Sequence, residues 1–170
     1  FRYFAKQILR LRLPSIPEGI DQLGPLEIGT LVHAILRRCF EALHAQGYFA
    51  SRSRRQGDPA AVLKEVAHRE FERFAATHPV GYPLLWTLLK ERLLTFLATV
   101  LQDDLDEMDR NGWEAVLFET DMVGRVAVPG QGGRAEEIAV TGRLDRIDWR
   151  PAQEQYRIVD YKFKSGLELK

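Results

Sequence analysis

Three side chains near the end of the sequence have the types and the spacing that metal-dependent hydrolysis requires. Asp160 and Lys162 stand two apart in the segment 156–163, which is rich in aromatic and β-branched residues and therefore predicts a strand. Alternate residues of a strand project from the same face, so we expect the carboxylate and the amine side by side. A preceding strand at 137–149 would bring Asp145 alongside. Two oxygen ligands and a lysine could hold a divalent cation and activate a water molecule, which is the chemistry of a nuclease site.

Each of these residues also has an ordinary structural explanation. An aspartate and a lysine two apart on an exposed strand are usually a solvated pair, and Asp148 could simply pair with Arg146 or Arg150. The order of the segments favours the functional interpretation. An apolar strand ends in Gly-x-x-Asp, a turn follows at 151–154, and a second apolar strand leads into Asp-x-Lys. Because Asp145 and Asp148 stand three apart, only one of them can share a strand face with the Asp-x-Lys carboxylate.

Two segments resemble a known family. Gly-Arg-Leu-Asp-Arg-Ile-Asp at 142–148 and Ile-Val-Asp-Tyr-Lys-Phe-Lys-Ser-Gly at 158–166 resemble motifs II and III of the RecB-type branch of the PD-(D/E)XK nucleases. Within this family, the two segments most resemble those of the nuclease domains of AddB-like and RecB-like subunits of bacterial helicase–nucleases. Gly-Thr-Leu-Val-His at 29–33 is similar to the family's Gly-Thr-x-x-His motif, and the opening Phe-Arg-Tyr-Phe to the end of its Cys-Pro-x-x-x-Phe segment. The region 50–115 resembles the family only in being helical.

The resemblance implies a catalytic core and a metal site. The family's catalytic residues match Asp145, Asp160 and Lys162, and its metal ligands match Asp145, Asp160 and His33. The motif selects Asp145 over Asp148, because the family's glycine stands three residues before its catalytic aspartate; Asp148 would face the other way, beside an arginine. The implied cofactor is Mg²⁺ or Mn²⁺, with Lys162 orienting the attacking water or steadying developing charge.

Other residues near these motifs have less specific roles. Glu119 follows a phenylalanine at a point where the family often has an acidic residue, and Tyr161 lies inside the Asp-x-Lys motif, so both are candidates for supporting roles. His33 borders the apolar stripe of a predicted helix, where a histidine is commonly hydrogen-bonded to a neighbour; the resemblance favours metal ligation instead. Cys39 fits a small core hydrophobe.

The implied function is that of a metal-dependent DNA exonuclease domain in a helicase–nuclease complex for double-strand break repair and recombination. The DNA would be a single strand delivered by a helicase subunit or a fused helicase domain, since the chain has no Walker A motif. The alternative is a catalytically inactive module with the same fold that guides DNA or serves as a scaffold. Retention of Asp145, Asp160, Lys162 and His33 argues against it, because an inactive site has no chemical reason to keep all four. A plain helical interaction domain would leave the terminal strands unexplained.

Two family features are missing from the sequence. The family continues beyond Asp-x-Lys with a helix that carries Gln-x-x-x-Tyr, and AddB-like members hold an iron–sulfur cluster on four cysteines. This sequence stops at Lys170, contains only Cys39 and begins with Phe1 in place of methionine. We therefore expect a piece of a longer protein, whose iron–sulfur cluster would lie outside these residues, and a fragment that folds but does not necessarily cleave on its own.

Composition limits the range of partners. Lys plus Arg equals Asp plus Glu at 24 each, so the net charge is zero, which argues against a free-standing protein that binds DNA non-specifically but leaves room for a local basic groove. The basic loop at 51–57 fits a solvated connector better than a nucleic-acid contact, and the acidic run at 103–107 fits a solvated helix face better than a metal site.

No apolar run approaches the ~18 residues of a membrane span, and no signal peptide opens the sequence, which predicts a cytoplasmic protein without membrane contact.

Hydrophobic periodicity predicts helices first and strands last. Apolar residues recur at helical spacing over 1–13, 26–46, 59–77 and 82–108, and at strand spacing over 113–120, 122–128, 137–149 and 156–163. The predicted fold class is therefore α+β. The resemblance implies a restriction-endonuclease-like core, with the long helices covering the outer faces of a small mixed β-sheet. We expect one partial nuclease domain over 1–170, helical over 1–112 and β-rich and catalytic over 113–170.

Overall fold

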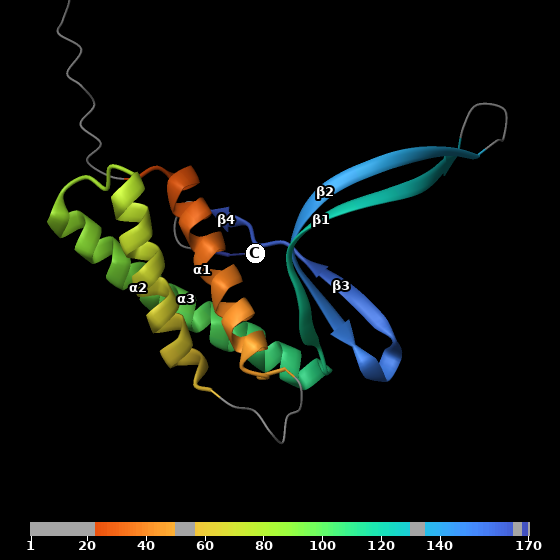
Figure 1. The fold of residues 1–170 in the computed structure, drawn as a ribbon, viewed down its shortest axis with the longest axis horizontal. Helices are drawn as coiled ribbons and strands as arrows, with labels where there is room; N and C mark the ends of the chain where they lie inside the picture. The colour runs from red at the N-terminus through yellow and green to blue at the C-terminus, as the bar shows by residue number, and fades with distance from the viewer. Residues whose placement is uncertain (1–22, 50–56, 130–134, 165–167, 170) are drawn as a thin grey trace, which may run out of the picture.

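The computed structural model describes residues 23–49, 57–129, 135–164 and 168–169 (Figure 1). Helices come first and strands last, which confirms the α+β class. The elements are α1 (Pro25–Ala45), α2 (Pro59–Thr77), α3 (Pro83–Asn111), β1 (Glu114–Pro129), β2 (Ala135–Arg150), the 3₁₀ helix η3 (Pro151–Gln153), β3 (Gln155–Val159), β4 (Phe163–Lys164) and β5 (Glu168–Leu169). The predicted helix at 1–13 lies outside the described residues, as does most of the basic loop at 51–57.

Local sequence signals set the helix ends. Each of the three helices has a proline in its first turn, where the missing N–H is not needed for a helical hydrogen bond. Asp58 caps α2 by accepting a hydrogen bond from the Ala60 N–H at 2.9 Å. Gly112 ends α3 with a φ of 74°, the left-handed conformation that glycine adopts without a steric penalty. The three helices predicted in this region are confirmed, although α3 runs on to Asn111.

One face of α1 forms the centre of the core. The apolar stripe predicted for this helix is buried, and apolar faces of α2 and α3 pack against it. The most enclosed apolar residues of the three helices are Leu31, Val32, Ile35, Leu36, Cys39, Phe40, Leu43, Leu63, Leu93, Leu97 and Met108. The other side of α1 contacts β1, β2 and β4, so this helix joins the helical layer to the strands.

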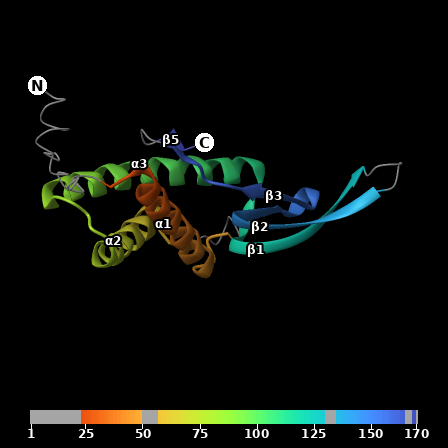
Figure 2. The ribbon, with the colours of Figure 1, turned by 90° about the horizontal axis from the view of Figure 1, so that it is seen from above.

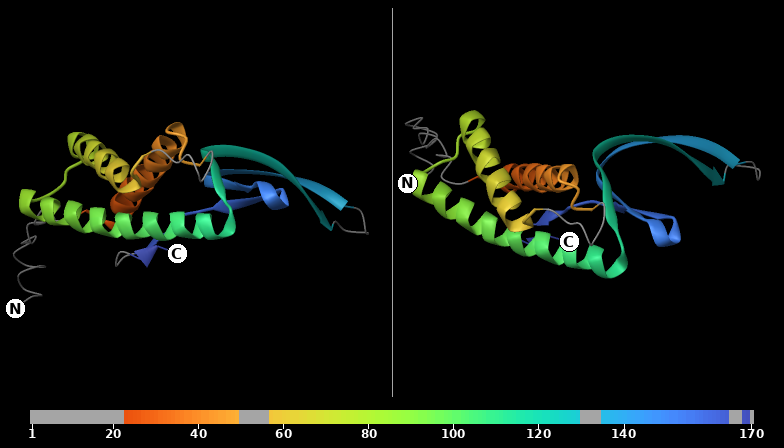
Figure 3. Two further views of the ribbon diagram at one scale, coloured as in Figure 1. Left: turned by 90° about the horizontal axis from the view of Figure 1, so that it is seen from below. Right: turned by 60° about the horizontal axis from the view of Figure 1, so that its bottom comes forward.

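The strands β1, β2 and β3 form an antiparallel sheet in that order. The expectation of a mixed sheet is therefore wrong for the described strands, and the two strands predicted at 113–120 and 122–128 are one strand of 16 residues. The β1–β2 hairpin extends beyond the helices as a long arm (Figures 2 and 3). Its apolar side chains are open to solvent, with Val123 78% and Ile138 50% exposed. Helices thus cover only the base of the sheet, because the hairpin is longer than the layer against which it packs.

The strand predicted at 156–163 is shorter in the structure. β3 ends at Val159, the next three residues have no regular secondary structure, and β4 then pairs with β5 beside α1. The Asp-x-Lys motif therefore lies in an irregular segment between two short strands.

The described helices are amphipathic, each with one buried face. Within the described parts of the chain, no helix combines the length with the apolar character needed to cross a bilayer.

Candidate active site

A cavity of about 730 Å³ lies between α1 and the base of the sheet. Its walls come from the first turns of α1, from β1 and β2, and from the segment after β3. The ionisable residues that line it are His33, Arg37, Glu119, Asp145, Arg146 and Tyr161. The cavity therefore brings together residues from motifs that stand more than a hundred positions apart in the sequence.

Asp145 and Asp160 lie opposite each other where β3 separates from β2. Arg146 and Val159 form the last pair of the antiparallel ladder, so Asp145 and Asp160 are the next residues on the two chains. The Asp145 side chain spans the gap, since its Oδ2 accepts a hydrogen bond from the Tyr161 N–H at 2.8 Å. The end of the ladder thus gathers the two carboxylates predicted from the motifs.

His33 approaches the same carboxylate from α1. Its Nδ1 lies 3.4 Å from Asp145 Oδ2, and its ring meets the Tyr161 ring edge-on, with the centroids 6.3 Å apart. The imidazole therefore faces the carboxylates and not the buried helical stripe that contains Leu31 and Ile35.

Asp160 and Lys162 form an ion pair with an Oδ2–Nζ distance of 2.8 Å, and both side chains are more than half exposed. The hydrogen bond from Lys162 lowers the pKa of Asp160 against the opposing effect of burial, and Asp160 in turn raises the pKa of Lys162. His33 and a side-chain hydrogen bond with Asp145 also lower the pKa of Asp160. Asp160 and Lys162 lie side by side as expected, but strand alternation is not the cause, because both residues follow β3 and are not part of it.

The donor atoms suit a hard divalent cation. Asp145 and Asp160 offer carboxylate oxygens, which Mg²⁺ and Mn²⁺ prefer, and His33 offers an imidazole nitrogen. Among the described residues, however, no three His, Cys, Asp or Glu side chains are gathered in a way that could hold an ion. The side chains of Asp145, Asp160 and His33 are therefore of the kind that binds a divalent metal. In this conformation, however, the three are not gathered around one point.

Tyr161 contributes its backbone to the site and its side chain to the interior. The phenol oxygen donates a hydrogen bond to Asp104 Oδ2 at 2.9 Å and also contacts Arg146. Burial raises the pKa of Tyr161 well above its usual value, so the phenol stays protonated. The N–H of Tyr161 thus fixes Asp145 while its ring anchors the segment, and its supporting role in the site stays a prediction.

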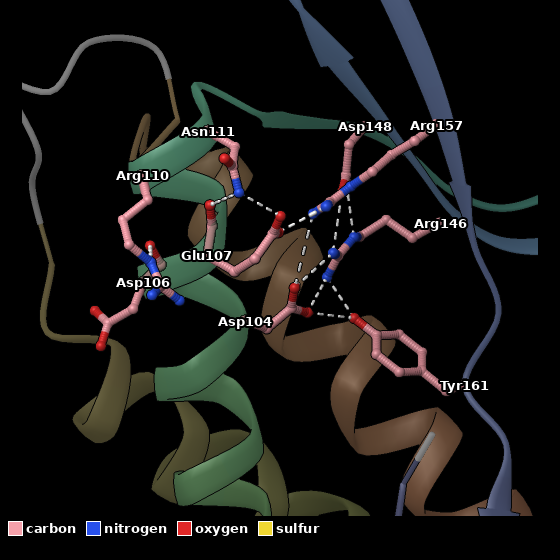
Figure 4. A network of polar contacts seen from close by, with 9 residues as sticks. All are labelled: Asp104, Asp106, Glu107, Arg110, Asn111, Arg146, Asp148, Arg157 and Tyr161. Atoms are coloured by element: carbon pink, nitrogen blue, oxygen red, sulfur yellow. Dashed lines mark hydrogen bonds and ion pairs between the residues drawn. The ribbon is translucent and has the colours of Figure 1, made fainter.

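Arg146 is the centre of a buried polar network (Figure 4). This residue is only 1% exposed, and its guanidinium binds Asp148 at 2.7 and 3.0 Å and Asp104 at 2.6 and 2.9 Å. Burial alone would lower the pKa of Arg146, but the hydrogen bond to Asp104 and the surrounding charges raise it. Asp148 is 0% exposed and also accepts a hydrogen bond from Arg157 at 2.8 Å. Asp148 therefore pairs with arginines, apart from the Asp145 site.

The acidic run at 103–107 is not the solvated helix face that its spacing predicts. Asp104 binds Arg146, and Glu107 binds Arg157 at 2.6 Å, so both carboxylates face the sheet (Figure 4). These two residues stand three apart and therefore share a face of α3, the face that meets arginines of β2 and β3. The remaining acids at 103 and 106 are exposed, as expected.

Glu119 lies at the rim of the cavity and is bound by two arginines. Its Oε1 is 2.7 Å from Nη2 of Arg143, and its Oε2 contacts Nη1 of Arg37. The Glu119 backbone has a φ of 42°, a left-handed conformation that a residue with a side chain rarely adopts. Glu119 thus lies near Asp145, as its supporting role requires, but its partners are cations.

Sequence reasoning missed Arg37, Arg143 and Asp104 as parts of this region, and it named Arg146 only as a possible partner of Asp148. Three of them carried a signal: Arg37 stands one helical turn after His33, Arg143 stands two residues before Asp145, and Arg146 stands two residues before Asp148, spacings that place each on the same face as its neighbour. No local signal could have identified Asp104, because its partners are on β2 and after β3.

The family model of the PD-(D/E)XK nuclease superfamily matches residues 1–168. The chain has no match among curated proteins. The family match includes α1 with His33, the end of β2 with Asp145, and the segment with Asp160 and Lys162. The chain therefore belongs to the PD-(D/E)XK nuclease superfamily.

Proposed function

We propose that this protein is a metal-dependent deoxyribonuclease that acts as the exonuclease domain of a helicase–nuclease complex in double-strand break repair and recombination. One observation carries the proposal: Asp145 is held by the Tyr161 N–H, faced by His33, and lies beside the Asp160–Lys162 pair. Membership of the PD-(D/E)XK nuclease superfamily implies the nuclease chemistry. The choice of DNA as substrate and of a helicase as partner rests on the resemblance of the three motifs to RecB-like and AddB-like domains.

The chain's own residues divide the work of phosphodiester hydrolysis. Asp145 and Asp160 would hold Mg²⁺ or Mn²⁺, with His33 as a further ligand; the bound ion would neutralise phosphate charge and lower the pKa of a water molecule. The Tyr161 N–H donates a hydrogen bond to Oδ2 of Asp145 and so orients the carboxylate. The other oxygen, Oδ1, does not take part in that hydrogen bond. The exposed ammonium of Lys162 can donate to the attacking water or to the developing phosphate charge.

The partners follow from the same resemblance. A DNA single strand would reach the cavity from a helicase subunit or a fused helicase domain. In an AddB-like parent, an iron–sulfur cluster would be held by cysteines outside this sequence, since Cys39 is buried within α1 and has no cysteine partner in the chain. A cytoplasmic location agrees with this assignment.

A non-catalytic module that guides DNA is the second candidate. The observation in its favour is that, in the described residues, no three potential ligands are gathered to hold an ion. The intact Asp160–Lys162 pair and the fixed Asp145 favour the nuclease, because a module that only guides DNA needs neither.

Cleavage of labelled single-stranded and double-stranded DNA by the full-length protein tests the proposal. Asp145→Asn and Lys162→Ala should each lower kcat on the order of 10²-fold or more, as removal of one electrostatic group from an active site does. Asp103→Asn is a matched control, since Asp103 is an exposed carboxylate on α3 that does not line the cavity. Wild-type cleavage by Asp145→Asn would rule out this site. Cleavage by none of the proteins, combined with tight DNA binding, would favour the guiding module.

A further inference from the structure

We propose that Arg37 and Arg143 form a phosphate-binding pair that seats a nucleic-acid backbone beside the Asp145 site, and that Glu119 is their counter-ion in the free protein. This inference rests on the proposed nuclease function and assigns the residues that position its substrate. In the nucleic-acid complex, a backbone phosphate would replace the Glu119 carboxylate between the two guanidinium groups.

The two arginines lie on the same faces of α1 and β2 as His33 and Asp145, one step away along each element. Arg37 stands four residues after His33 on α1, and Arg143 stands two residues before Asp145 on β2, so each lies on the same face of its element as the site residue. The step is about 6 Å along a helix and about 7 Å along a strand. A charged pair therefore lies one step from the His33–Asp145 pair, close to the spacing of neighbouring phosphates on a nucleic-acid strand.

Both oxygens of Glu119 face these arginines. Arg143 binds Oε1 at 2.7 Å and Arg37 contacts Oε2, so the carboxylate bridges α1 and β2 across the rim of the cavity. Glu41 lies 3.9 Å from Arg37 Nε, a long distance, and its side chain is 43% exposed, so this ion pair is weak. The guanidinium groups of Arg37 and Arg143 share the single carboxylate of Glu119, so positive charge is left at the rim of the cavity. Because a guanidinium group lies beside each of its oxygens, Glu119 is a poor candidate for a metal ligand in this conformation.

The backbone of Glu119 supports a specific role. Its neighbours Phe118 and Thr120 pair with Arg146 and Leu144 of β2, which places Glu119 opposite Asp145. Its φ of 42° is unfavourable for any residue with a Cβ, and such conformations persist only where the surrounding structure holds them. The flanking strand pairs hold its backbone, and the two ion pairs hold its side chain. Guanidinium groups suit phosphate as well as carboxylate, because their N–H groups can bind two oxygens at once.

Binding of a fluorescent single-stranded oligonucleotide to the full-length protein, measured by anisotropy in EDTA, separates this role from catalysis. The Arg37→Ala/Arg143→Ala double variant should bind at least about tenfold more weakly, and the slope of log K against log salt should fall by about 1.4, since each phosphate contact on a single strand contributes ~0.7. The matched control is Arg125→Ala, which removes an exposed arginine from the same hairpin; Arg125 pairs only with Glu137, at 3.3 Å, in the described structure. That control should bind like the wild type.

The second variant is Glu119→Gln, which frees both guanidinium groups and keeps the size of the side chain. It should bind the oligonucleotide more tightly than the wild type at low salt. In cleavage assays, Arg37→Ala should raise KM more than it lowers kcat, because the arginine contacts a phosphate away from the reacting one.

Three results would overturn the inference. If the double variant folds and binds like Arg125→Ala while the wild type binds and cleaves, the arginine pair is wrong and the nuclease function stands. If Glu119→Gln loses metal-dependent cleavage with unchanged binding, Glu119 acts at the reacting centre. If the wild type neither binds nor cleaves nucleic acid, the proposed function fails and the inference with it. Should the double variant not fold, the Glu119→Gln affinity decides: a value no higher than that of the wild type refutes the counter-ion role.

Discussion

Replacing Asp148 with alanine should destabilise the fold and leave the proposed chemistry intact. Asp148 is fully buried and accepts hydrogen bonds from Arg146 at 2.7 and 3.0 Å and from Arg157 at 2.8 Å. Arg146 is 1% exposed, so water cannot replace the lost carboxylate. Removal of one partner from a buried ion pair typically costs about 3–5 kcal/mol, because the other charge stays buried without compensation.

The remaining contacts place the expected loss at the lower end of that range. Arg146 would keep both hydrogen bonds to Asp104, and Arg157 would keep Glu107 at 2.6 Å. We therefore expect a decrease of about 3 kcal/mol in the free energy of unfolding. This is a large part of the 5–15 kcal/mol that is typical of a domain, so the variant should remain folded in buffer but melt at a clearly lower temperature.

Urea unfolding of the 170-residue chain, followed by far-UV circular dichroism, measures this loss. Asp103→Ala is the matched control: it removes an exposed carboxylate from the same helix as Asp104 and should change stability by no more than about 0.5 kcal/mol. Asp145→Ala loses the hydrogen bond from the Tyr161 N–H and should cost about 1 kcal/mol. At a temperature where all variants of the full-length protein are folded, Asp148→Ala should cleave DNA nearly normally, whereas Asp145→Ala should not cleave. An Asp148→Ala variant as stable as Asp103→Ala would refute the buried network, and a folded Asp148→Ala variant without activity would refute the assignment of Asp145.

Three other predictions concern single groups. Gly112→Ala should lower the free energy of unfolding in urea by about 1 kcal/mol, because φ is 74° at that position and the added Cβ would contact no neighbouring atom. An unchanged midpoint of urea unfolding would contradict the left-handed end of α3. Cys39 should react with thiol reagents at pH 8 only as the chain unfolds, because burial raises its pKa to about 12; equal rates with and without urea would show that the thiol is accessible. Chelation of divalent metal by EDTA should stop DNA cleavage by the full-length protein, and excess Mg²⁺ should restore it; cleavage that persists in EDTA would exclude a metal-dependent reaction.

Hydrophobic periodicity predicted where most helices and strands lie, but it did not predict how the strands pair. The stripe of α1 was readable because residues three and four apart share a helix face, and its residues Leu31, Val32, Ile35, Leu36, Cys39, Phe40 and Leu43 are buried. Strand alternation predicted extended segments but could not decide whether neighbours run parallel or antiparallel, since pairing joins residues far apart in the chain. The length of the β1–β2 arm also escaped prediction, because Asp121 interrupts the alternation without breaking the strand.

The candidate site was predicted by motif, and its supports were not. Gly-x-x-Asp and Asp-x-Lys pointed to Asp145, Asp160 and Lys162, which the end of the β2–β3 ladder gathers, although their catalytic roles remain predictions. The buried network was out of reach because a helical projection shows which acids of α3 share a face but not what that face meets. Asp104 has no partner within α3 that would reveal its role; its partners are Arg146 and the Tyr161 phenol.

Tyr161 ties the candidate site to the interior through two different atoms. Its N–H holds Asp145, while its hydroxyl is bound to Asp104 in the buried network (Figure 4). Hydrogen exchange at this amide should therefore require the network to open, and should be as slow as exchange at the deepest amides of α3, even though the surrounding segment has no regular secondary structure. The carboxylate and the core would then open as one cooperative unit, so that the site does not loosen on warming before the whole domain melts.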